Sequence, residues 1–120
     1  MTLSLSRAQI LAHRRRASGL EERSDYTAES LRRAAWAGLQ DSMPRAALLS
    51  IHARVTDTRS DSWEDPALVQ IWGPRFSAYA VPAKDRHVFT VSRMPDDPRG
   101  LAVAEDMATR MAALLGKRRM

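Results

Sequence analysis

The sequence predicts a mainly α-helical protein with a small β element, and three observations support this fold class. Alanine, the strongest helix former, supplies 19 of the 120 residues, whereas only 6% of the residues are aromatic. Apolar side chains recur at helical spacing over residues 31–39 and again over 101–115. Large and small side chains alternate in RFSAYAV, which favours a strand over 75–81. At this length and with 44% hydrophobic residues, we expect one globular domain.

Cap residues predict where the first two helices begin. Ser6 followed by Gln9 forms a capping-box pattern, and Gly19 suits a helix end, so we expect a helix over 6–18. Thr27 is the expected cap of a second helix. Its apolar stripe would consist of Leu31, Ala34, Ala35, Gly38 and Leu39. Because small residues dominate this stripe, a neighbouring helix could approach closely.

The third predicted helix spans 44–55 and begins at Pro44, a residue that favours the first helical position. One face would carry Leu48, Ile51, His52 and Val55. The helix is apolar nearly all round, which predicts that it is the most buried one. On such a face, His52 is expected to be a hydrogen-bonded core histidine.

The second half contains one short helix, the strand, an ambiguous segment and a long helix. Asp65 followed by Pro66 predicts a helix start, with Gly73 as its end. Residues 83–94 fit a strand or a helix. The DP pair at 97–98 predicts the start of a final helix that Gly116 ends.

The charge balance favours a polyanionic partner. There are 17 Arg and 2 Lys against 14 acidic residues, which gives a net charge of +5 and a pI near 10.7. Residues 1–20 contain four arginines and no acid, and residues 117–119 form a second basic cluster. Cationic side chains bind phosphates with release of counterions. The alternative is that the arginine content reflects a GC-rich genome, and the second cluster also complements a helix dipole.

Other classes of protein receive no support from the composition. The chain has no cysteine, no apolar run near the ~18 residues that span a bilayer, and a basic cluster after its first apolar residues, the reverse of a signal peptide. We therefore expect a cytoplasmic protein without membrane contact.

Metal and cofactor sites are not predicted either. The three histidines, His13, His52 and His87, lie far apart without metal-ligand spacing, and the five glycines form no phosphate-binding loop. We expect no metal and no cofactor. The three tryptophans could stack on bases but are expected to be the large anchors of the core, namely Trp36, Trp63 and Trp72.

Several segments resemble one known family. They are AAWAGLQDSMPRAALLSIHARV, WEDPALVQIWGPRFSAYAVPAKD, HVFTVSRMP and LLGKRRM, while LSRAQILAHRRRASGL looks like the first helix of that family. Together they resemble the N-terminal part of the winged-helix DNA-binding family that includes the AlkZ-type bacterial DNA glycosylases. The resemblance implies a winged-helix-like single module over 1–120, as the N-terminal part of a longer tandem winged-helix protein, with double-stranded DNA as partner.

The same resemblance implies catalytic candidates in the GLQ region. Glycosylase members carry a Gln, any residue, Gln signature that positions the attacking water, and some have Asp at its second position. The matching residues here are Gln40, Asp41 and Ser42, so Gln40 is the candidate, Asp41 is one residue off the motif, and Ser42 is a poorer water holder. The competing interpretation is a turn at a helix end, in which Asp41 or Ser42 caps the helix beginning at Pro44.

Three functions stay open at this point. The first is a DNA-binding module that does not release an alkylated base by itself. The second is an active glycosylase for alkylated or crosslinked purines in a complete form, and the third is a helical protein-interaction module. The expected DNA contacts are Arg14, Arg15, Arg16, Arg75, Arg86, Lys117, Arg118 and Arg119.

Overall fold

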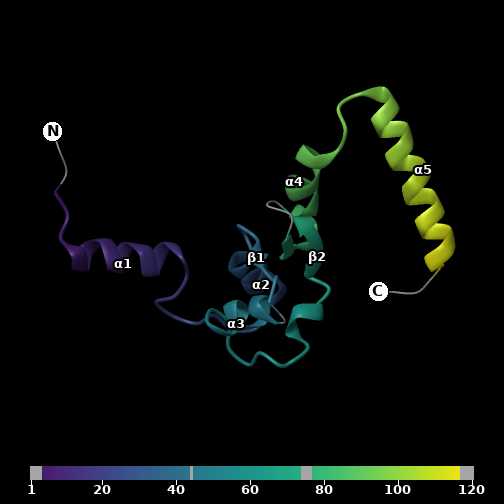
Figure 1. Ribbon diagram of the computed structural model, residues 1–120. Helices are drawn as coiled ribbons and strands as arrows, with labels where there is room; N and C mark the ends of the chain where they lie inside the picture. Colours follow the sequence, from purple (N-terminus) through teal and green to yellow (C-terminus); the bar gives the residue numbers. More distant parts are fainter. Residues whose placement is uncertain (1–3, 44, 74–76, 117–120) are drawn as a thin grey trace. The chain divides into compact units, whose positions relative to one another are not determined.

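The computed structural model describes residues 4–43, 45–73 and 77–116 (Figure 1), and these fall into two compact units that divide between Phe89 and Thr90. In the described part, helices predominate and the strands form a small antiparallel sheet. The predicted fold class, mainly α with a small β element, is confirmed at this level.

The first two helices begin where the cap residues predict. Helix α1 spans Arg7–Ala17, and Ser6 and Gln9 form both hydrogen bonds of the capping box. Helix α2 spans Ala28–Ala34 and is capped by the Thr27 hydroxyl, which accepts a hydrogen bond from the Ser30 N–H.

The end of α2 corrects the predicted stripe. The helix already ends at Ala34, Gly38 has a left-handed φ of +79° in the turn that follows, and Leu39 belongs to strand β1, Leu39–Gln40. A Cβ at position 38 would also lie 3.2 Å from the Tyr79 ring, so this turn requires glycine for two reasons. The helical spacing of apolar residues in the sequence therefore continues beyond the end of α2 at Ala34.

Helix α3, Ala46–His52, is shorter than the predicted 44–55, and residue 44 lies outside the described residues. Ala47 and Ile51 are fully buried on its inner face, and Val55 follows in the core. Leu49, in contrast, is 71% exposed, so the apolar side chains around the helix do not all lie in the core. A small unit has too little material to cover every face of one helix.

His52 is exposed rather than buried in the core, which corrects its predicted place. It lies in the last turn of α3, where its Nδ1 is 2.6 Å from the Thr58 hydroxyl and 3.3 Å from Arg23 Nη2. The expectation that it is hydrogen-bonded is confirmed, but its partners are on the surface.

The segment after Asp65 is a strand, not the predicted short helix. Strand β2 spans Leu68–Gly73 and strand β3 spans Ser77–Pro82, so the predicted strand over 75–81 is confirmed for its described residues. The Asp65 carboxylate accepts a hydrogen bond from the Ala67 N–H at 2.8 Å and forms a tight turn. The Asp-Pro signal was therefore a turn signal, and the following β-branched and aromatic residues pair with β3.

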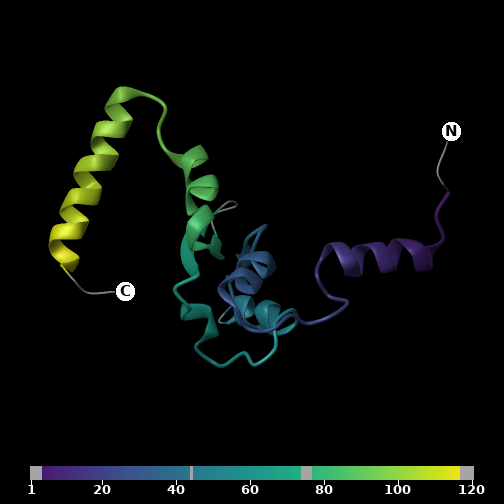
Figure 2. The same ribbon diagram turned by 180° about the vertical axis from the view of Figure 1, so that it is seen from behind.

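The three strands form an antiparallel sheet in the order β1-β3-β2. Val69 lies opposite Val81, and Ile71 and Gln40 both lie opposite Tyr79. Figures 1 and 2 show α2 and α3 beside this sheet from both sides. The central strand β3 thus connects the edges that carry Gln40 and Gln70.

Residues 83–93 are helical and Met94 is extended, which resolves the ambiguity of the sequence. Short 3-10 turns, Ala83–Asp85 and Val91–Arg93, flank helix α4, Arg86–Thr90. Helix α5, Pro98–Leu115, begins after the Asp97 cap and ends at Gly116, as predicted.

The core of the first unit is small and rich in alanine. It consists of Leu31, Ala34, Ala35, Ile51, Val55 and Leu68. Trp63 packs against this core and lies 5.7 Å from the Arg45 guanidinium. Trp36 and Trp72 are 69% and 63% exposed, so the prediction that all three tryptophans anchor the core is wrong for these two. Alanine and aliphatic side chains fill the space between α2 and α3 instead.

A surface ion pair joins α2 to the turn before α4. The Arg32 guanidinium donates to both carboxylate oxygens of Asp85, at 2.9 and 3.1 Å. This hydrogen bonding lowers the pKa of Asp85 below its ordinary value of 3.8 and raises that of Arg32. The pair links residues 53 positions apart, with α2 on one side and the β3–α4 connection on the other.

Acid should therefore weaken the first unit through Asp85. Because the carboxylate has the lower pKa in the folded state, its contribution is fully present above pH 3.8 and is lost as the pH falls through the folded pKa. Urea unfolding of wild type and Asp85→Asn between about pH 2 and 6 measures this. The variant should show a shallower loss of stability below pH 3.8, and identical pH profiles would contradict the linkage.

Candidate nucleic-acid interface

The arginines of α1 do not all lie on one face of the helix. At about 100° per residue, Arg7 and Arg14 are two turns apart and point in nearly the same direction when viewed down the helix axis. Arg15 lies about 100° further round the helix. Arg16 is on the opposite side from Arg7, and its Nε lies 3.3 Å from a Glu21 carboxylate oxygen. The three consecutive arginines therefore spread over about 200° of the helix circumference, with Arg15 between Arg14 and Arg16.

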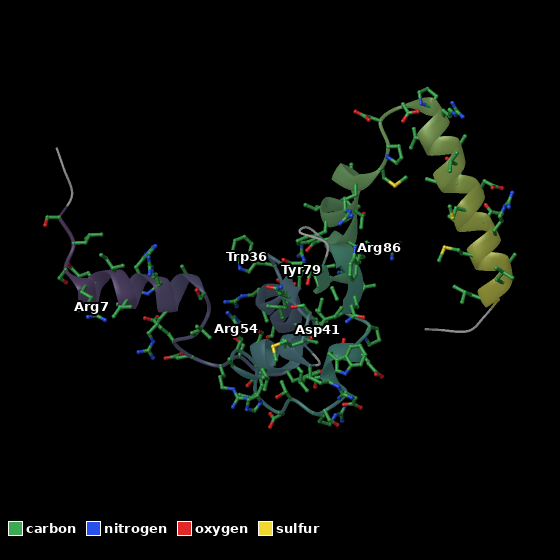
Figure 3. The ribbon with its side chains drawn as sticks, viewed as in Figure 1. Arg7, Trp36, Asp41, Arg54, Tyr79 and Arg86 are labelled. Carbon is green, nitrogen blue, oxygen red and sulfur yellow. The ribbon has the colours of Figure 1, made fainter. Side chains whose placement is uncertain are left out.

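Arg7, Arg14 and Arg15 form what we call the arginine face. All three are exposed, and within the described part of the chain their side chains have no hydrogen bond and no ion pair. Figure 3 shows Arg7 projecting from α1. Helix α1 contains no acidic residue to neutralise them. The arginine face is thus a concentrated positive charge open to solvent.

Arg7 was not among the residues predicted to contact DNA, although the signal was present. A seven-residue separation within a helix brings two side chains to the same face, so Arg7 and Arg14 could have been grouped from the predicted helix alone. Adjacent positions such as 15 and 16 point in different directions.

The other predicted DNA contacts are dispersed. Arg86 is exposed at the first turn of α4 and is labelled in Figure 3, but it interacts with other groups in the protein. Arg75 and the cluster of Lys117, Arg118 and Arg119 lie outside the described residues. Of the predicted contacts, the structure therefore describes Arg14, Arg15, Arg16 and Arg86.

The predicted catalytic candidates lie at the start of the sheet, not on a helix. Gln40 is exposed on β1, and its amide Nε2 donates to the Ser42 hydroxyl at 3.0 Å. Tyr79 lies opposite Gln40 on β3. The Gln40 side chain, which by resemblance would position the attacking water, is therefore hydrogen-bonded to Ser42 on an exposed surface.

Asp41, which is labelled in Figure 3, accepts hydrogen bonds with both of its carboxylate oxygens. Oδ1 accepts from the Ala47 N–H at 3.0 Å, and Oδ2 accepts from the Gln70 amide at 2.9 Å. Arg45, at the cap position of α3, has a left-handed φ of 67° and no side-chain cap bond. Asp41 therefore caps α3 from outside the turn, which agrees with the capping interpretation.

Replacing Asp41 with alanine should lower the free energy of unfolding by about 0.5–2 kcal/mol, the range for loss of a helix cap. The substitution leaves the Ala47 N–H and the Gln70 amide without their acceptor. Asp41→Asn is the matched control, because its amide oxygen still accepts from Ala47. Denaturant unfolding that shows equal losses for both variants would contradict the capping role.

Comparison with protein-family models, with curated proteins and with solved structures gave no match. The described residues include no group of three or more His, Cys, Asp or Glu side chains that could hold a metal ion. Within the same residues, no helix has both the length and the apolar character required to cross a membrane.

Proposed function

We propose that this chain is a winged-helix-like module that binds double-stranded DNA through phosphate contacts and with little sequence preference. The observation that carries the proposal is the arginine face, three unpaired cations on a helix without acidic residues. Unpaired guanidinium groups bind phosphates at little cost, because no internal ion pair has to be broken first.

The arrangement of the first unit supports the winged-helix part of the proposal. Helices α2 and α3 precede the β2–β3 hairpin, and β1 pairs with β3 on the other side. In a winged-helix module, such a hairpin forms the wing next to the helices. The resemblance of the sequence to that family points to the same arrangement.

The segment between α3 and β2 supports weak sequence preference. A helix-turn-helix protein reads bases with a recognition helix in the major groove. Here residues 57–65 contain four acidic residues and one arginine, Arg59, and their one short helical turn is Ser62–Glu64. Arg59 is itself paired with Asp61 at 3.5 Å. A negative segment of this kind is repelled by DNA, so the expected affinity comes from phosphate contacts.

The test is the salt dependence of binding to two duplexes of unrelated sequence. We expect the logarithm of the affinity to fall linearly with the logarithm of salt concentration, with about 0.9 units of slope per phosphate contact, and equally for both duplexes. Fluorescence anisotropy of labelled duplexes measures this. Absence of binding at about 50 mM salt, or an affinity that does not depend on salt, would refute the proposal.

A further inference from the structure

An open pocket lies between the end of α1, the start of the following segment, and α2. Its volume is about 230 Å³. Arg16, Arg33 and Arg54 line it, together with Glu22 and Trp36. Cofactor and drug sites usually occupy about 300–1,000 Å³, so this pocket is the size of a phosphate group with part of its nucleotide.

The pocket is built by hydrogen bonds that fix one of its arginines. Arg54 Nε donates to the Ser18 carbonyl at 2.8 Å, and Nη1 donates to the Ser50 carbonyl at 2.8 Å. These bonds hold the guanidinium group in place and leave Nη2 without a bond in the described residues. A guanidinium fixed in this way is preorganised to donate to an anion.

The charges of the lining match a phosphate. Three arginines and one glutamate line the pocket, and because Arg16 is paired with Glu21 at 3.3 Å, the remaining lining charges sum to +1. The Arg33 side chain has no ion pair or hydrogen bond in the described part. The Glu22 carboxylate repels an anion from one side of the pocket. The remaining positive charge matches the single negative charge of a phosphodiester.

Trp36 defines the chemistry next to the phosphate position. It is 69% exposed, three residues after Arg33, and Figure 3 shows its ring standing clear of the ribbon. A large exposed indole beside arginines is the arrangement on which unpaired bases stack in single-strand binding proteins. A base inside a duplex cannot stack on it, because both faces are covered by neighbouring bases.

We infer that this pocket binds one phosphate of single-stranded DNA, with the adjoining unpaired base stacked on Trp36. Arg33 and Arg54 donate to the phosphate oxygens, and Arg16 adds charge at the rim. This activity goes beyond duplex binding by the arginine face, because it uses different residues and an unpaired strand.

The experiment measures binding of an oligothymidylate of about eight nucleotides by anisotropy and by tryptophan fluorescence. Trp36→Ala should weaken binding roughly 5- to 150-fold, the range for loss of one stacked base. Trp72→Ala is the matched control, since Trp72 is 63% exposed and does not line the pocket. The fluorescence quenching on binding should persist in Trp72→Ala and disappear in Trp36→Ala.

Arginine variants test the phosphate contact. Arg33→Ala should weaken oligothymidylate binding and reduce its salt slope by about 0.7, the value for one contact to a single strand. Arg99→Ala, which removes an exposed arginine of α5, should change neither. Circular dichroism and thermal unfolding establish that all variants are folded.

The outcomes separate this inference from the proposed function. Equal affinities of Trp36→Ala and Trp72→Ala for the oligonucleotide would refute the inference. Binding of inorganic phosphate alone as tightly as the oligonucleotide would also refute it, because the pocket would then be a site for free phosphate. If Trp36→Ala and Arg33→Ala still bind duplex DNA but no longer bind the single strand, the inference is supported. If the oligonucleotide binds as described and duplexes do not bind, the proposed function fails and the pocket stands.

Discussion

Replacing Ile51 with alanine should lower the free energy of unfolding by about 2–5 kcal/mol, the usual range for truncating a buried aliphatic side chain. Ile51 is fully buried, and it belongs to the core between α2 and α3. Its neighbours are largely alanine and short aliphatic side chains, which cannot move far enough to fill the cavity. Since small domains have total stabilities of about 5–15 kcal/mol, the variant should lose a large share of its stability.

Leu49→Ala is the matched control on the same helix. It removes a side chain of similar volume, but Leu49 is 71% exposed, so the change should be within about 0.5 kcal/mol. Urea unfolding followed by circular dichroism measures both variants. Equal effects would mean that the inner face of α3 is not the one described.

Replacing Arg7, Arg14 and Arg15 together with alanine should reduce the salt slope of duplex binding by about three units, one for each lost phosphate contact. At about 50 mM salt, the affinity should fall on the order of 100-fold or more. All duplex sequences should be affected alike, because phosphates carry no sequence information. None of these residues lines the Trp36 pocket, so oligothymidylate binding serves as an internal comparison.

A charge-matched triple variant excludes a simple effect of net charge. Arg59, Arg99 and Arg110 are exposed and lie outside α1, the first in a loop and the other two on α5. Replacing them with alanine also removes three of the five net charges, but leaves the arginine face intact. If both triple variants lose the same salt slope, the contact surface is not on α1.

Local sequence signals predicted the helices because caps act within a few residues. The Ser6–Gln9 pair, Thr27 and Asp97 each satisfy N–H groups of their own helix, so their spacing alone was enough. The strand β2 was missed for the opposite reason. Asp65 followed by Pro66 is compatible with a helix start and with a turn, and pairing with a strand that comes later in the sequence decided between them.

The candidate site shows the same division between local and distant information. The direction of each arginine on α1 follows from helix geometry once the helix is placed. The role of Asp41 depends on Gln70, which lies on the far edge strand, 29 residues away, and thus on the strand order. The Trp36 pocket likewise depends on Arg54, whose contact with Ser18 spans 36 residues. Sequence patterns that extend over a few residues carry no information about contacts between residues so far apart in the chain.

The absence of buried residues in α1 has a consequence for amide exchange. An isolated helix of 11 residues is only marginally stable in water, so the α1 amides should open and exchange with solvent without unfolding of the core. The amides of α3, which carries Ile51, should exchange only through opening of the whole unit. Bound duplex DNA should then slow exchange in α1 first, and part of the binding free energy would be used to order this helix.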